Sequence, residues 1–153
     1  MPEGSRERRT LVIDLDPTFP PEIARWLWVL GDTRHRTLET LDGVDESTLD
    51  VPGPGGNSIG TILAHIAVIE VDWMCAEILE QPYPDDLVAL LPPSARDPDG
   101  QLTATPATPL GRYVTALDAV RERLLDTVRA LDLTDLRRPR SLPDYDVSPD
   151  WVL

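Results

Sequence analysis

The chain has 153 residues, of which 14 are basic and 27 acidic, so its formal net charge at pH 7 is −13. Because so acidic a surface repels phosphate backbones and anionic lipid, we expect neither nucleic acid nor a membrane as a partner. No apolar run approaches the roughly 20 residues of a membrane span, no signal-peptide pattern follows the N-terminus, and the single cysteine excludes a disulfide scaffold. The composition predicts one soluble cytoplasmic domain.

The first predicted helix runs from about Pro21 to Leu41, and two prolines stand where the first turn tolerates them. Arg34 interrupts its apolar stripe. We expect residues 1–19 to form an N-terminal arm, with residues 11–15 as a short extended piece, and residues 20–153 to form the helical domain. The stripe recurs at three- and four-residue steps and consists of Ile23, Trp26, Leu27, Leu30, Leu38 and Leu41.

The second predicted helix follows a run of prolines and glycines at 51–56, which cannot form regular structure. Asn57 or Ser58 offers a side-chain N-cap, and the helix is expected to end near Gln81. One apolar stripe is expected to face the bundle interior, and it consists of Ile59, Ile62, Ile66, Ile69, Trp73 and Ala76.

A proline-rich excursion over residues 81–107 separates the second and third helices, and connections of this length tend to be lids or mobile segments. Its DDLVALL segment is expected to form an apolar turn or two that packs back on the bundle. The third helix is predicted to begin at Thr108-Pro109 and to continue for about six turns. Arg121 is expected on one of its polar faces. Its stripe consists of Leu110, Tyr113, Val114, Leu117, Val120, Leu124, Leu125, Val128 and Leu131.

The last six residues are typical of a helix start, with Ser148 as N-cap, Pro149 in the first turn and an acidic residue after it. Three helices with broad apolar faces close naturally with a fourth. The predicted fold is therefore an all-α four-helix bundle whose fourth helix is only begun at Ser148–Leu153. We expect the natural chain to continue past Leu153 or to end unusually early.

His65 is the main candidate for chemistry, since the chain has only two histidines. On a helical wheel it points within about 40° of Ile69 and Asp72, which places it close to the predicted interior. It is either a core histidine bonded to a neighbour, or a metal ligand or general base. A catalytic metal usually needs three protein ligands, and no second or third ligand stands at helical spacing.

The other reactive or aromatic residues favour structural roles. His35 lies between two arginines and is expected on a solvated face, and Cys75 is expected to be a partly buried structural thiol. Trp73 and Trp151 are core or interface aromatics, or they line the mouth of a pocket. The chain contains no glycine-rich phosphate loop and no CxxC motif.

The segment Asn57 to Trp73 resembles the second helix of the DinB-like superfamily, whose hallmark is an L-x-H-[LI]-A-x-x-E-x-x-W run. Three further segments are similar to the same superfamily in the same order. They are R-x-x-T-L-E-T-L-D-G in the first helix, L-T-D-L-R-R after the third, and S-P-D-W-V-L at the start of a fourth. The resemblance covers about Pro21 to Leu153.

This resemblance implies an up-down four-helix bundle, often dimeric, in which three histidines hold a divalent metal of the zinc or nickel class. His65 matches the first ligand, and the other two belong to an H-x-x-x-H pair expected beyond Leu153. Members of known activity use a low-molecular-weight thiol such as mycothiol or bacillithiol in transfer or isomerisation. We therefore expect a metal-dependent thiol transferase, isomerase or hydrolase that acts on a small molecule, with Asp72, Trp73 and Trp151 as pocket candidates. The alternative is a non-catalytic bundle for dimerisation or ligand binding, without a working metal site.

Overall fold

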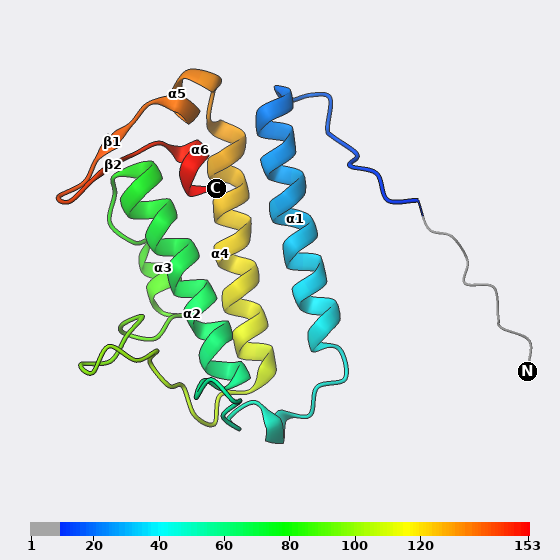
Figure 1. The fold of residues 1–153 in the computed structure, drawn as a ribbon, viewed down its shortest axis with the longest axis vertical. Coiled ribbons are helices and arrows are strands. Elements are labelled where there is room, and N and C mark those ends of the chain that lie inside the picture. Colours follow the sequence, from blue (N-terminus) through cyan, green and yellow to red (C-terminus); the bar gives the residue numbers. More distant parts are fainter. Residues whose placement is uncertain (1–9) are drawn as a thin grey trace, which may run out of the picture.

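The computed structural model describes residues 10–153, which fold mainly into three long helices. They are α1 (Pro21–Leu41), α2 (Ile59–Asp72) and α4 (Leu110–Ala130), and α2 continues directly into a π-helix, η2 (Trp73–Leu79). Figure 1 shows α4 running between α1 and α2. The all-α prediction is confirmed, and so are the approximate bounds of the three helices.

The short elements connect the long helices or gather at one end of them. A single 3₁₀ turn, η1 (Glu46–Thr48), lies between α1 and α2, and α3 (Asp85–Val88) lies within the excursion. After α4 come α5 (Leu133–Arg137), an antiparallel hairpin of β1 (Arg140–Ser141) and β2 (Asp146–Val147), and α6 (Pro149–Val152). Figure 1 shows α5, the hairpin and α6 together at the end of the bundle where α2 and α4 finish. The sequence patterns predicted α6 and the turn of α3, but neither α5 nor the hairpin.

The helix starts follow the predicted capping in part. Ser58 is the N-cap of α2, and its hydroxyl accepts a hydrogen bond from the Thr61 amide at 3.2 Å. The predicted cap of α4 is wrong, because the N-cap is Pro109 and no side chain bonds to the first turn. Ser148 is the N-cap of α6 as predicted, but its hydroxyl bonds to the Asp150 carboxylate instead of accepting from the backbone.

The face that α2 presents to the core is not the predicted one. The predicted stripe lies on the outside, where Ile62 and Trp73 are 45% and 40% exposed and Ile66 and Ile69 are only half-buried. We call these four residues, of which Trp73 is the first residue of η2, the outer row of α2. Ile59 and Ala76, from the same stripe, are also half-buried. The buried residues of α2 are Gly60, Thr61, Leu63, Ala64, Ala67, Val68 and Val71.

Small side chains explain this choice of face. α2 is apolar nearly all round, so its periodicity does not single out one side. Gly60, Ala64 and Ala67 are buried on the side of α2 that packs against α4. At Gly60, a Cβ atom would lie 2.6 Å from Tyr113 Oη. The face with the smaller residues is therefore the one that becomes buried.

The predicted stripe of α4 is confirmed, because Tyr113, Leu117, Val120, Leu124 and Val128 are all buried. The position predicted for Arg121 is wrong. It lies among these apolar residues and is only 9% exposed, although its side chain is charged.

The remaining segments lie outside the three-helix core. Residues 10–15 of the predicted arm form neither helix nor strand, and Leu11 and Val12 are exposed, whereas residues 1–9 lie outside the described part. In the excursion, α3 buries Leu87 against the bundle as predicted. None of the helices in residues 10–153 is both long enough and apolar enough to cross a membrane.

Candidate functional site

His65 lies near the middle of α2, at the edge of the outer row. It comes three residues after Ile62 and four before Ile69, so these three side chains are neighbours on the helix surface. The residue is half-buried rather than interior. Its Nδ1 atom is buried and has no hydrogen-bond partner among the described residues. The imidazole is therefore not held by a bonded neighbour at that nitrogen, as a satisfied core histidine would be.

An unpartnered imidazole nitrogen fits a metal ligand, but one ligand does not make a metal centre. Within residues 10–153, no three side chains of His, Cys, Asp or Glu lie close enough together to hold an ion. His65 thus fits as a single ligand, and the described residues do not complete a site around it.

Asp72 lines a cavity of about 320 Å³ beneath the excursion. The Tyr83 hydroxyl donates a hydrogen bond of 2.5 Å to Asp72 Oδ1, and burial together with this carboxylate raises the pKa of Tyr83. His65 lines neither this cavity nor the adjacent one between α2 and α4. Of the two polar side chains that the wheel placed on one face, only Asp72 therefore lines the cavity.

The two tryptophans do not share a pocket. Trp151 lines a shallow cavity of about 340 Å³ together with residues 145–148 of the hairpin and its exit. Trp73 is exposed in η2 and lines neither this cavity nor the two beneath the excursion.

A buried ion-pair network joins the three long helices. Arg34 of α1 donates to both carboxylate oxygens of Glu70 on α2, at 3.2 and 3.0 Å. Arg121 of α4 donates to the same carboxylate, by Nε to Oε2 at 3.2 Å and by Nη2 to Oε1, and also to the Leu30 carbonyl. Arg34 is only 8% exposed. Burial lowers the pKa of Arg34, while the charge of Glu70 opposes that shift.

The sequence contained a signal for this network that the prediction did not use. Arg34 comes four residues after Leu30, and Arg121 comes four after Leu117, so both arginines occupy inward positions of apolar stripes. Glu70 comes three residues before Trp73, so it lies beside the apolar stripe predicted for α2.

Glu77 is a further buried acidic residue that was not predicted. Its Oε1 accepts a 2.6 Å hydrogen bond from the Tyr145 hydroxyl, and its Oε2 is buried without a partner in the described part of the chain. It lies in η2, where the wider π turn changes the direction of each side chain from the one that an α-helical wheel assigns.

The predicted environment of His35 is confirmed, whereas Cys75 is more deeply buried than predicted. The His35 side chain is 70% exposed, with Nε2 lying 3.3 Å from Glu39 Oε1. Cys75 is buried, and burial raises the pKa of its thiol. The Cys75 thiol is therefore not placed for nucleophilic attack.

Comparison with known protein families gives a match over most of the chain. The family model of the DinB superfamily matches residues 30–153, from the second half of α1 to the end of α6. The matched segment contains His65 and all three members of the buried network. No curated protein matches the chain.

Proposed function

The chain belongs to the DinB superfamily, and on that basis we propose that it is a divalent-metal-dependent enzyme domain of the thiol-transferase, isomerase or hydrolase type. The observation that carries this proposal is the buried, unpartnered Nδ1 of His65. A metal of the zinc or nickel class is the partner that this nitrogen would take. We place the protein in the cytoplasm, where a low-molecular-weight thiol and a small-molecule substrate are its partners in this proposal.

The further ligands would come from the element that covers the outer row. His65 stands at the edge of this apolar row, so an element that packed on Ile62 and Ile69 would bring its own side chains close to the imidazole. We propose that this element is a fourth helix or a second chain, and that it contributes the remaining histidines.

In this proposal, His65 binds the metal ion and Glu70 holds α2 in position. A bound divalent ion lowers the pKa of a thiol or water and so supplies a nucleophile near neutral pH. His65 would hold the ion from α2. Glu70, five residues further along α2, ties this helix to α1 and α4 through two arginines, and so fixes the position of the imidazole.

The metal content of two matched variants tests the proposal. The chain offers its own control, because His35 is the other histidine and is exposed. In protein expressed from the complete gene and loaded with Zn²⁺ or Ni²⁺, we expect about one ion per chain for the unsubstituted protein and for His35→Gln. His65→Gln should lose most of the bound metal, as measured by mass spectrometry of the metal after dialysis.

Circular dichroism of the same samples distinguishes a lost ligand from a lost fold. We expect His65→Gln to keep its helical signal while it loses the metal. If His65→Gln retains the ion, or if the unsubstituted protein takes up none, the metal-dependent function is wrong.

A non-catalytic bundle is the second candidate function. It is favoured by the outer row, which leaves large apolar side chains exposed along one helix and so indicates a binding surface. In this case the protein would act as a homodimerisation or ligand-binding module, and His65→Gln would change neither metal content nor association.

A further inference from the structure

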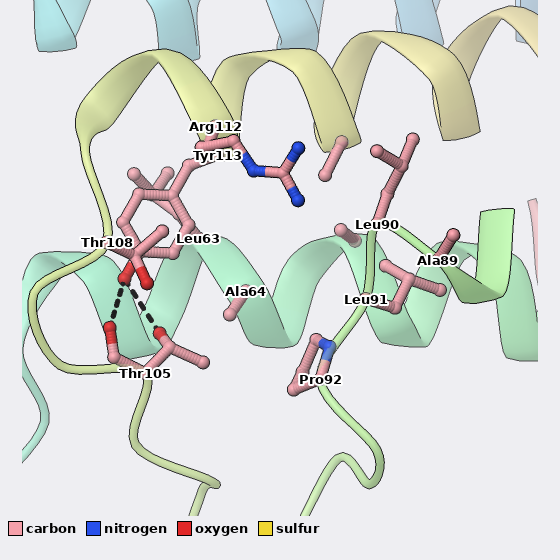
Figure 2. Close-up of a pocket in the computed structure, with 12 residues that line it drawn as sticks. Leu63, Ala64, Ala89, Leu90, Leu91, Pro92, Thr105, Thr108, Arg112 and Tyr113 are labelled. Carbon is pink, nitrogen blue, oxygen red and sulfur yellow. Dashed lines mark hydrogen bonds between the residues drawn. The ribbon is translucent and has the colours of Figure 1, made fainter.

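The cavity adjacent to that of Asp72 lies between α2, the first turns of α4 and the excursion, and its volume is about 220 Å³. Figure 2 shows its walls, to which α2 contributes Leu63 and Ala64, and the excursion contributes Leu90, Leu91 and Pro92. Leu91 and Pro92 also line the Asp72 cavity, so the two are adjacent. His65 lines neither, so binding in this cavity is independent of the proposed metal function.

One charged side chain, Arg112, lines this otherwise largely apolar cavity. Figure 2 shows its guanidinium group extending from α4 into the space in front of Leu90 and Leu91. It forms no hydrogen bond or ion pair with any residue from 10 to 153, and no carboxylate lines the cavity. Three other arginines of α4 are all paired with acidic residues, namely Arg121 with Glu70, Arg123 with Asp86 and Arg129 with Asp126.

The other polar groups at the cavity are hydroxyls, and two of them already have partners. Tyr113 Oη donates to the Thr105 carbonyl at 2.8 Å and lies 2.7 Å from Thr105 Oγ1. Arg112 stands in the first turn of α4, where no side chain caps the backbone amides, so the positive end of the helix dipole adds to its charge. The electrostatics of this cavity therefore favour an anion, although the whole chain has an excess of acidic residues.

We propose that this cavity binds a small carboxylate with an apolar tail. The planar guanidinium group of Arg112 matches a carboxylate in a two-bond arrangement, and the leucines and alanines of α2 and the excursion receive the tail. A volume of about 220 Å³ lies below the usual range for drug-sized ligands, so the ligand is a short organic acid rather than a nucleotide or a peptide.

Three probes separate the contributions of charge and tail. In an NMR titration of the ¹⁵N-labelled full chain with hexanoate, we expect saturable shifts of the Leu63, Ala64 and Leu90 amides. Hexanamide has the same tail without the charge, and acetate has the charge without the tail. Because hydrogen bonds to charged groups contribute about 1.5–3 kcal/mol, hexanamide should bind at least about tenfold more weakly than hexanoate. Acetate should also bind more weakly, since it leaves the apolar walls uncovered.

Two arginine variants test whether Arg112 holds the carboxylate. Arg112→Gln should weaken hexanoate binding at least about tenfold, by the same energetic reasoning. Arg25 on α1 is another exposed arginine that has no partner in the described residues. Arg25→Gln removes the same charge away from the cavity, so the affinity of this variant for hexanoate should be unchanged. Equal affinity in Arg112→Gln, equal binding of hexanamide or acetate, or no saturable shift at all would overturn the proposal.

Discussion

Glu70 is the residue that joins the three long helices, since its carboxylate accepts hydrogen bonds from Arg34 of α1 and from Arg121 of α4. Removing one partner of a buried ion pair leaves the other charge without compensation in a low-dielectric setting. Here the loss would leave two buried guanidinium groups facing each other. The network therefore ties both α1 and α4 to α2 through a single side chain.

Glu70→Ala should accordingly lower the free energy of unfolding by about 3–5 kcal/mol, a large fraction of the stability of a typical domain. The matched control is Asp86→Ala, which breaks the surface pair that Arg123 forms at 3.2 Å and should cost less than about 1 kcal/mol. Urea unfolding followed by circular dichroism measures both. Equal losses in the two variants would show that the buried network contributes no more than a surface pair.

Glycine has opposite roles in two of the helices. In the interior of α1, the position that a Cβ would take at Gly31 has no atom within 4 Å, so this glycine only adds conformational freedom to the unfolded chain. In the first turn of α2, Gly60 lies against the Tyr113 ring, where a Cβ would come within 2.6 Å of the hydroxyl oxygen and 3.0 Å of Cζ. Tertiary packing therefore favours glycine over alanine at position 60, whereas helix propensity favours alanine at position 31.

The same substitution should thus have opposite signs at the two positions. Gly31→Ala should stabilise the protein by about 0.5–1 kcal/mol, because alanine is the better helix former. Gly60→Ala should destabilise it by about 1–3 kcal/mol, since the Tyr113 ring must move. Thermal and urea unfolding give both values. Stabilisation by Gly60→Ala would mean that α2 and α4 are less closely packed than the structure shows.

Across the bundle as a whole, one apolar side is left open by the described residues. α4 packs against both α1 and α2, whereas the outer row of α2 faces away from α4 and its two end members, Ile62 and Trp73, are exposed. An exposed apolar row of this kind is typical of a surface that binds another element or chain. Our proposals for a homodimer and for additional metal ligands both depend on this row.

Charge introduced into the outer row should therefore prevent association. If a second copy covers the row, size-exclusion chromatography with light scattering should give twice the monomer mass for the unsubstituted protein and the monomer mass for Ile62→Glu. Val51→Glu is the control, because Val51 is an exposed apolar residue in a loop outside α2. A monomeric unsubstituted protein, or a dimer that persists in Ile62→Glu, would contradict association through this row.

The positions of the long helices could be predicted from the sequence, because their limits depend on neighbours in the chain. Two prolines begin α1, Ser58 caps α2, and the period of apolar residues continues through α4. The sequence also singled out His65 as the candidate ligand. The hairpin and α5 were not predicted, since two-residue strands carry no periodic signal and are held by contacts such as that of Arg140 with the Ile78 carbonyl.

The direction in which the side chains face depends instead on tertiary contacts. α2 is apolar on two sides, so the buried side was fixed by the small residues that let α4 approach. Arg121 is buried because Glu70, 51 residues away in the chain, lies opposite it. His65 and Asp72 share a face on the wheel but not a cavity, because the excursion covers Asp72 and leaves His65 beside the open row. Each of these outcomes depends on a partner distant in sequence, which local periodicity does not contain.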